Sequence, residues 1–519
     1  MKPNRLSRRW SAGAAAGCCL IMIAATGEAR RNPEPGPPSL SRETMRAILR
    51  EFVDFLALPN VASDRENIRR NAEHLAGMMQ ARGIETRILE TEGGPPVVAG
   101  ELRVPGARRT ILVYAHYDGQ PVDPAAWASD PWRPVLRTGT ISGGARAIRI
   151  EDLPEDGAGE WRLYGRGTSD DKGTIVAALA ALDVLKERRK PLSVNVKYLF
   201  EGEEESGSPH LEALLRGQAA LFRADGMVLC DGPVHQTRKP QIVFGARGVI
   251  GLEMTVFGPD RALHSGHYGN WAPNPAAVLS HILASLRGKD GKIDIPGFYD
   301  DVRPSTEAEK SALAATPLVD DELRREFGLA WTEAGGARLE EQIMLPALNI
   351  RGLNSGNVGA RAQNAVPPEA SASIDFRLVP DQTPDKVRKH VEAFIRTLGY
   401  EVVHGELSAA ERRQAPKFIR MKWEGGYPAY RESMDAPFPQ ALIRTLDAAT
   451  GGTLIKMPAL GGSIPMEMFA RVLGLPVVLF PIANHDNNQH GPDENIRLKN
   501  LWDGVETHAA LLSELGANW

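Results

Sequence analysis

The sequence is poor in cysteine and has no excess of positive charge. Its 519 residues contain three cysteines, Cys18, Cys19 and Cys230, and the first two stand in an N-terminal apolar run. A chain cleaved after that run keeps only Cys230, which excludes an internal disulfide. The apolar run GMVLCDG around Cys230 indicates a buried structural cysteine rather than a nucleophile. The formal net charge of −4, with no basic run after the N-terminal segment, argues against a general nucleic-acid binder.

Internal repeats and long low-complexity tracts are also absent from the sequence. Hydrophobic residues make up 42% of the chain and charged residues 24%, which is typical of a soluble globular protein. A chain of 519 residues can bury a large core and is long enough for two domains.

The N-terminus has the pattern of an export signal. The apolar run SAGAAAGCCLIMIAATG is preceded by basic residues, namely Lys2, Arg5, Arg8 and Arg9. This order, with cleavage near Gly27 or Ala29, predicts a signal peptide over residues 1–29 and a Pro-rich linker over 30–44. We expect a periplasmic or extracellular protein without a membrane span after cleavage, because the apolar run is short for a span. An uncleaved anchor and a lipoprotein modified at Cys18 are the alternatives.

Strand-like and helical patterns alternate between residues 45 and 244. Strand-like runs such as TILVYAHYDG and LSVNVKYLF are separated by helical runs such as IVAALAALDVLKERR. This alternation predicts an α/β fold with a mainly parallel sheet flanked by helices. Half-exposed strands such as ASASIDFRLV predict a separate α+β domain over 245–428, and the α/β pattern returns over 429–519. We therefore expect one α/β domain that is interrupted by an inserted α+β domain.

Five polar clusters follow apolar runs or turns of the α/β segments. Their acidic and imidazole residues are His116 and Asp118, Asp170 and Asp171, Glu203 to Glu205, Asp231, and His490, Asp493 and Glu494. Ligands bind beyond the carboxyl ends of strands in an open α/β sheet, so distant segments converge there. Each cluster alone is a weak signal, since such residues are more often found in exposed turns. Two histidines and several carboxylates in one crevice together suit Zn²⁺, or Mn²⁺ or Co²⁺ in the same ligand set.

Seven motifs follow one another along the chain: HYDGQPVDP, GRGTSDDKG, EGEEESGS, LCDGP, LHSGHYGN, FRLVPDQTP and GGSIP. In this order they resemble the co-catalytic zinc peptidases, which include carnosine dipeptidases, glutamate carboxypeptidase, aminoacylases and succinyl-diaminopimelate desuccinylase. The resemblance extends over residues 45–519 and is strongest to the dipeptidase branch. It implies a catalytic domain in two parts, 45–244 and 429–519, with a lid and dimerisation domain inserted over 245–428.

That resemblance implies a binuclear metal centre. Asp170 would bridge two divalent ions, and Asp171 beside it would not bind them. The remaining ligands would be His116 and Asp231 at one ion, and Glu205 and His490 at the other. The expected ions are zinc, with manganese and cobalt as alternatives.

Two further carboxylates would lie beside the ions. Asp118 would accept a hydrogen bond from His116 and fix its tautomer. Glu204 would be the general base, and counting back from the SGS motif assigns base and ligand to Glu204 and Glu205. Glu204 would take a proton from a water shared by the ions, hydroxide would attack an amide carbon, and the proton would pass to the leaving amine. We expect residues 204 and 205 in an extended segment, so that their side chains point to opposite sides.

The inserted domain and the GGSIP turn would contact the substrate. His264 would stabilise the oxyanion in the active site of a second subunit, which predicts a homodimer. Arg377 would bind a substrate carboxylate, which suits its guanidinium fork. Gly462 and Ser463 would hold the same carboxylate, and Asn364 would be a further substrate contact.

These roles predict an exported metal-dependent amide hydrolase. We expect a dipeptidase or carboxypeptidase-like enzyme that releases a C-terminal amino acid with a free carboxylate. Its substrate would be a small peptide or an N-acyl amino acid, and an N-acyl-amino-acid deacylase is the first alternative. A non-catalytic binding protein on the same fold is the second alternative, and it is disfavoured because every expected ligand and the base are present.

Overall fold

The computed structural model describes residues 40–413 and 417–519. The predicted signal peptide and linker residues 30–39 lie outside the described residues. Helix α1 (Arg42–Leu56) begins within the predicted linker, because the Ser41 side chain caps it by accepting a hydrogen bond from Thr44 N. Among the described residues, no helix is both long and apolar enough to cross a membrane.

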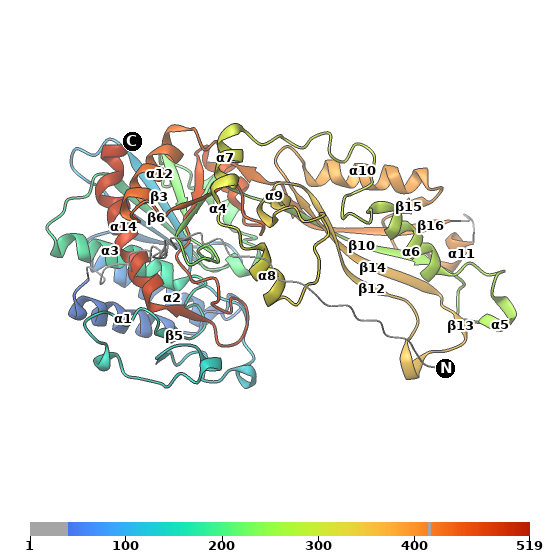
Figure 1. The fold of residues 1–519 in the computed structure, drawn as a ribbon, viewed down its shortest axis with the longest axis horizontal. Coiled ribbons are helices and arrows are strands. Elements are labelled where there is room, and N and C mark those ends of the chain that lie inside the picture. The colour runs from blue at the N-terminus through green and yellow to red at the C-terminus, as the bar shows by residue number, and fades with distance from the viewer. Residues whose placement is uncertain (1–39, 414–416) are drawn as a thin grey trace, which may run out of the picture. The chain divides into compact units, whose positions relative to one another are not determined.

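An eight-stranded sheet organises the α/β part of the chain (Figure 1). In spatial order its strands are β1 (Glu85–Leu89), β2 (Val97–Leu102), β6 (Asn195–Glu201), β3 (Thr110–His116), β7 (Gly226–Leu229), β19 (Val477–Leu479), β8 (Gln241–Val243) and β18 (Ile455–Met457). The central strands β6, β3, β7 and β19 run parallel. Antiparallel pairs join β1 to β2, β2 to β6 and β19 to β8. The predicted α/β class is therefore confirmed, with the parallel pairing concentrated at the centre of the sheet.

Both faces of this sheet are buried, which explains the continuous apolar runs of its strands. Along β3, Ile111 and Val113 pack into one core, and Leu112 and Tyr114 pack into the other. The helices over the first core are α1, α2 (Arg65–Gln80), α3 (Lys172–Glu187), α12 (Pro437–Ala449) and α14 (Leu498–Asn518). The helices over the second core are α4 (Leu211–Gly217) and α13 (Met466–Leu473). Helices α3 and α14 pack side by side (Figure 1), so the C-terminal segment completes the fold begun in the first half.

A five-stranded sheet is formed by the middle of the chain. In spatial order its strands are β12 (Ala347–Asn354), β14 (Glu369–Leu378), β10 (Gly248–Phe257), β16 (Phe418–Tyr427) and β15 (Glu401–Val403). Ile250 and Leu252 of β10 pack into a third core with helices α6 (Pro275–Leu286) and α10 (Pro384–Thr397). Because side chains alternate along a strand, the opposite face carries Val249, Arg377 and Tyr427, which are paired in register. The domain boundaries at 245 and 428 stay a prediction.

A three-stranded sheet joins two distant segments that lead to the polar clusters. Strand β5 (Arg162–Tyr164) pairs with β4 (Val135–Arg137) and with β20 (Asn495–Arg497). Strand β5 leads toward Asp170, and β20 follows His490, so this sheet holds the two segments side by side. The two-stranded pairs are β11 (Leu263–His264) with β13 (Ala365–Val366), and β9 (Gly245–Ala246) with β17 (Tyr430–Arg431). The remaining short helices are η1 (Pro124–Ala126), η2 (Ile141–Gly143), η3 (Ile150–Asp152), η4 (Glu204–Ser206), α5 (Ser265–Tyr268), α7 (Glu307–Ala315), α8 (Asp320–Glu326), α9 (Leu339–Ile343), η5 (Gly359–Arg361) and α11 (Ala409–Arg412).

Candidate metal centre

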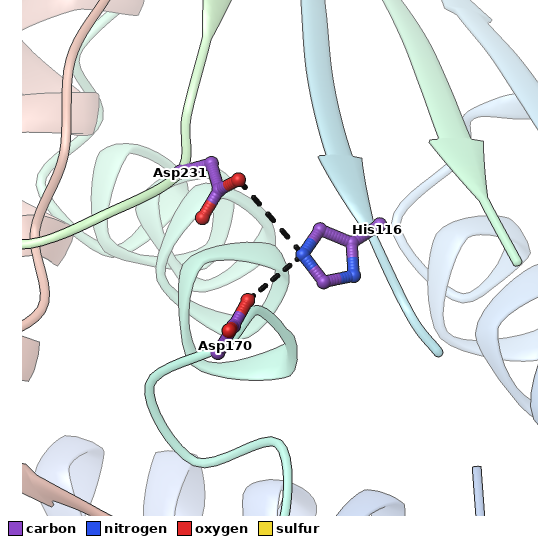
Figure 2. Close-up of side chains that lie close together, drawn as sticks. All are labelled: His116, Asp170 and Asp231. Atoms are coloured by element: carbon purple, nitrogen blue, oxygen red, sulfur yellow. Dashed lines mark hydrogen bonds and ion pairs between the residues drawn. The ribbon is translucent and has the colours of Figure 1, made fainter. Parts of the chain in front are cut away.

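Three buried side chains meet at the carboxyl ends of two neighbouring strands (Figure 2). His116 is the last residue of β3, Asp231 follows β7, and Asp170 precedes α3. His116 Nε2 lies 2.9 Å from Asp170 Oδ1 and 4.0 Å from Asp231 Oδ2. Strands β3 and β7 are parallel and end at the same edge of the sheet, which is where the strand-end pattern predicted a site.

Asp170 belongs to a second cluster through its other carboxylate oxygen. Its Oδ2 lies 3.1 Å from His490 Nε2, and the same nitrogen lies 3.2 Å from Glu205 Oε2. Within each group of three residues, one ligand atom from each lies within 4.8 Å of the others. A carboxylate that turns one oxygen to each group has the arrangement that a ligand shared by two ions needs.

The electrostatics of these clusters fit divalent cations. Burial and the neighbouring Asp170 raise the pKa of Asp231 to about 6, and Asp231 Oδ1 is buried without a hydrogen-bond partner. Burial opposes protonation of His116, but Asp118 and Asp170 outweigh it and raise the pKa of the imidazole. Burial also acts to raise the pKa of Asp170, yet His116 and His490 hold that pKa below its usual range. Several buried carboxylates need compensating positive charge, and imidazole nitrogen with carboxylate oxygen is a donor set for zinc, manganese or cobalt.

Asp118 connects His116 to the loop that follows β6. Its Oδ1 lies 3.3 Å from His116 Nδ1, the ring nitrogen opposite the one that faces Asp170. Its two oxygens also accept hydrogen bonds from the backbone N–H groups of Glu204 and Glu205, at 3.1 Å each. The buried carboxylate of Asp118 therefore orients the imidazole and the glutamate loop together, and the sequence predicted only the first contact.

Glu204 and Glu205 do not lie in an extended segment, so that prediction was wrong. They form the short helix η4, which closes through a 2.7 Å hydrogen bond from Gly207 N to Glu204 O. Gly207 has a φ of 84°, a left-handed conformation that glycine adopts without strain. The two side chains still differ in their contacts: Glu205 faces His490, whereas no hydrogen bond or ion pair within the described chain engages the Glu204 carboxylate. Burial raises the pKa of Glu204 well above its ordinary value.

The other two glutamates of the acidic run have structural partners. Glu201 is fully buried and accepts a 2.6 Å hydrogen bond from the Tyr114 hydroxyl, and burial raises the pKa of Glu201 to about 8. Glu203 accepts a hydrogen bond from His210 N at 2.9 Å and lies 2.8 Å from His210 Nδ1. Two glutamates of the run thus reach the candidate site, and two hold the loop.

Arg377 and Ser463 are joined although they come from distant parts of the chain. Arg377 Nη1 donates a 2.8 Å hydrogen bond to Ser463 Oγ, and its Nε lies 3.2 Å from Asp375 Oδ2. Ser463 Oγ also lies 3.4 Å from the carbonyl oxygen of Gly248, where β10 begins. Gly462 precedes Ser463 in the same turn. A Cβ atom would fit at this position, so steric crowding does not explain why the residue is a glycine.

His264 and Asn364 lie together but apart from the metal-type clusters. Both are exposed, and the carbonyl of Asn364 accepts a 2.9 Å hydrogen bond from Ser265 N. His264 Nδ1 accepts a hydrogen bond from Gly266 N at 3.1 Å, and its ring centre lies 4.5 Å from that of His267. Among the described residues, no hydrogen bond or ion pair links His264 to either cluster.

Two glutamines at the clusters were missed by the sequence reasoning. Gln489 Nε2 donates to Asp170 Oδ2, and Gln120 Nε2 donates to Glu205 Oε2, both at 2.8 Å. Gln489 directly precedes His490, so its place in the motif was a signal that could have identified it. Gln120 belongs to the HYDGQ motif, and its place there was a similar signal.

Tyr427 is a third residue that the sequence did not reveal. It pairs with Val249 of β10, and Val249 also pairs with Arg377 of β14, so the tyrosine and the arginine lie on either side of Val249 on one face of the sheet. Burial raises the pKa of Tyr427 to about 12, and the negative charge of Glu204 adds to this effect. No pattern in the GGY segment of β16 distinguishes this residue from an ordinary strand tyrosine.

Comparison with known proteins decides the family. The family model of peptidase family M20/M25/M40 matches residues 112–514. The chain belongs to this family. Membership confirms the predicted family resemblance and the predicted enzyme class, a metallopeptidase.

Relatives of this peptidase are similar over most of their length. The chain is 29% identical to the Beta-Ala-His dipeptidase of Homo sapiens, over 81% of this chain and 78% of the relative. It is 27% identical to the Cys-Gly metallodipeptidase DUG1 of Candida albicans, over 91% of this chain and 96% of the relative. Among solved structures, an M20 family metallo-carboxypeptidase from Sulfolobus solfataricus is 29% identical and superimposes with a TM-score of 0.72, covering 91% of this chain and 99% of that one. These similarities confirm the fold of the peptidase as a whole.

Proposed function

We propose that this dipeptidase-type metallopeptidase cleaves the amide bond that precedes a C-terminal amino acid with a free carboxylate. The observation that carries the proposal is the contact of Arg377 with Ser463, which sets a guanidinium and a hydroxyl side by side. A carboxylate is the ligand that such a pair of donors favours. Relatives named as dipeptidases for Beta-Ala-His and Cys-Gly act on substrates that end in such a carboxylate, which supports the proposal.

Two groups of three residues would hold two divalent ions. The first group is His116, Asp170 and Asp231, and the second is Asp170, Glu205 and His490. The donor set suits zinc, with manganese and cobalt as alternatives. When bound, the ions would lower the pKa of a water molecule toward neutrality and polarise the amide carbonyl.

Glu204 would transfer the proton during hydrolysis. Its carboxylate is not engaged by another described side chain and is partly exposed, so it can accept a proton from water and donate that proton to the leaving amine nitrogen. Asp118 would hold the backbone of Glu204 and the ring of His116 in place through the contacts described above.

Arg377, Ser463 and the backbone at Gly462 would bind the substrate carboxylate, and Asn364 would be a further contact. Tyr427 lies on the same sheet face as Arg377, and its pKa responds to Glu204, so its ring would close the space between the carboxylate site and the base. This arrangement would hold the C-terminal residue of the substrate at a set distance from the amide that is cleaved.

A homodimer would complete the active site. His264 is exposed, and in the part of the chain that the structure describes no hydrogen bond or ion pair joins it to the metal-type clusters of its own subunit, which supports an oxyanion role for His264 of the partner subunit. Strand β12 forms one edge of the five-stranded sheet and exposes Ile350 and Leu353, which are 40% and 60% accessible. A sheet edge that exposes apolar side chains is suited to pairing with a second copy.

Export to the periplasm or the extracellular space is part of the proposal. It rests on the basic and apolar pattern of residues 1–29, which lie outside the described residues. N-terminal sequencing of protein recovered from separated cell fractions tests it, and an intact N-terminus in a cytoplasmic fraction would refute it.

The central experiment compares four kinds of substrate at fixed metal loading. These are dipeptides, the same dipeptides with a C-terminal amide, N-acetyl amino acids and N-succinyl amino acids. We expect turnover of free dipeptides and a large loss for the amides. Equal turnover of acids and amides would remove the carboxylate site, and faster turnover of N-acyl amino acids would replace the dipeptidase with a deacylase.

A further inference from the structure

Glu494 is a buried carboxylate that lies outside both metal-type clusters. Its side chain has no solvent exposure. Oε1 accepts hydrogen bonds from Ser169 N at 2.9 Å, Ser169 Oγ at 3.1 Å and Asp170 N at 3.1 Å. Oε2 accepts from Gly167 N at 3.0 Å and from Arg166 Nη1 at 2.7 Å. All the donors therefore come from the segment that ends at Asp170.

This environment requires an acceptor at both oxygens. A carboxylate can accept every one of these bonds, whereas the amide of glutamine would turn an NH₂ group toward N–H donors. The substitution of Glu494 by glutamine keeps the shape of the side chain but leaves buried donors without an acceptor, which is costly. The function of Glu494 can therefore be tested with Glu494→Gln, a substitution that leaves the volume of the side chain almost unchanged.

Arg166 ties the same two segments together from the other side. Besides its bond to Glu494, Arg166 Nη2 donates to the carbonyl oxygen of Gly491 at 3.3 Å. Its guanidinium lies 5.2 Å from the ring centre of Trp127, and its side chain is only 2% exposed. Arg166 precedes Asp170 in the chain, and Gly491 directly follows His490, so one side chain contacts both segments that carry candidate ligands.

The backbone supports the same connection. Strand β5 ends at Tyr164, which pairs with Asn495 of β20, and Gly165 N donates a 3.0 Å hydrogen bond to the carbonyl oxygen of Glu494. The candidate ligand Asp170 follows β5 by a few residues, and the candidate ligand His490 precedes β20 by a few residues. Their separation is therefore set by the β5–β20 pairing together with the Arg166–Glu494 ion pair.

We propose that Glu494 and Arg166 are positioning residues of the metal centre, which hold the Asp170 oxygens in register with His490. This inference rests on the proposed metal ligands. Within residues 40–413 and 417–519, no hydrogen bond or ion pair joins either residue to a candidate ligand atom. Glu494 would act through the backbone of Asp170, and Arg166 would act through Glu494 and Gly491. Partners of this kind affect metal affinity and activity by roughly 10–100-fold when they are changed.

The test measures metal affinity directly. Metal-free wild type and Glu494→Gln are titrated with Zn²⁺ in competition with a chromophoric chelator. We expect two Zn²⁺ per wild-type chain, and roughly 10–100-fold weaker binding of Zn²⁺ in Glu494→Gln. At saturating Zn²⁺ we expect a lower kcat with an unchanged KM for dipeptides, since Arg377 and Ser463 are untouched.

A matched control separates positioning from general stability. Arg431 Nε and Glu309 Oε1 form another buried pair, 2.9 Å apart, with side chains that are 2% and 5% exposed. We expect Glu309→Gln to lower the thermal midpoint and to leave Zn²⁺ affinity at the wild-type value. Equal loss of Zn²⁺ affinity in Glu309→Gln and Glu494→Gln would overturn the inference.

A milder variant covers the case in which Glu494→Gln does not fold. Ser169→Ala removes one hydrogen bond from Glu494 and keeps the ion pair with Arg166. We expect Ser169→Ala to bind Zn²⁺ more weakly than wild type, by less than Glu494→Gln. Wild-type Zn²⁺ affinity in Ser169→Ala, and in Glu494→Gln if that variant folds, would refute the positioning role but would leave the proposed function standing. Failure of the wild type itself to bind two ions would refute the proposed function instead.

Discussion

Arg377 donates a hydrogen bond to Ser463 across 2.8 Å, and this contact links the five-stranded sheet to the GGSIP turn. The two residues come from segments that are separated in the chain by every element from α10 to β18. Their contact brings a positive charge to the turn beside which Tyr427 and Glu204 also lie. The proposed specificity of the peptidase for a free C-terminal carboxylate would therefore depend on how these segments pack.

Replacing Arg377 with methionine should weaken the binding of dipeptides. We expect kcat/KM to fall roughly 10–100-fold, mainly through KM, because a hydrogen bond to a charged group is lost. Turnover of C-terminal amides should change little, since they lack that charge. Arg420→Met serves as the control, because Arg420 lies in strand β16 of the same sheet and pairs with the exposed Glu406. A similar loss for acids and amides in Arg377→Met would contradict the carboxylate role.

Replacing Glu204 with alanine should abolish most activity while the metals stay bound. The general base contributes roughly 10²–10⁴-fold to such reactions, and the candidate ligands are unchanged in this variant. Metal content by elemental analysis and steady-state rates are the two measurements. Glu203→Gln is the matched control, because Glu203 contacts His210 rather than the clusters. Near-normal rates in Glu204→Ala would show that another group acts as the general base.

Mixing two inactive variants should restore activity if His264 acts across a dimer. A dimer of one His264→Ala subunit and one Glu204→Ala subunit has one site with both an intact Glu204 and an intact His264 of the partner subunit. Random exchange between the two variants should recover about a quarter of wild-type activity in a symmetric dimer. Rates are measured before and after subunit exchange. No recovery, with exchange verified by mass spectrometry, would place His264 in the site of its own subunit or outside any site.

The stability of the metal-free protein should fall between neutral and mildly acidic pH because of His508. This residue is buried in α14, and burial lowers its pKa to about 4 although Nδ1 donates a hydrogen bond to Gly504 O. The unfolded chain, with an ordinary pKa of about 6.5, binds the proton more readily than the folded chain. The stabilisation is therefore complete above about pH 6.5 and is lost as the pH falls toward 4, by at most on the order of 3 kcal/mol.

The check for His508 is the urea midpoint at pH 7 and pH 5 for wild type and His508→Gln. Other titrating groups contribute equally to both proteins and cancel in the comparison. We expect the wild type to lose more stability than His508→Gln over this interval. An equal loss of stability in the two proteins would show that His508 does not titrate between pH 7 and pH 5.

The two sheets and most of the clusters could be predicted from the sequence. Runs such as TILVYAHYDG indicate strands because both faces of the sheet are buried, as Ile111 and Leu112 show by packing into different cores. His116 and Asp231 could be identified because the ends of parallel strands meet at one edge of the sheet. The extended segment at Glu204 was predicted wrongly, because the conformation of that loop depends on the turn at Gly207 and on backbone bonds to Asp118.

The sequence by itself determined which side chains are candidates for the chemistry, since local patterns and motif order are written in consecutive residues. Only the tertiary structure decided that Asp170 turns one oxygen to His116 and the other to His490. It also decided that Glu494 accepts a hydrogen bond from the backbone of Asp170 and that Tyr427 and Arg377 lie on either side of Val249. These relations depend on how distant segments pack against one another, and packing is a property of the whole folded chain rather than of any single stretch of it.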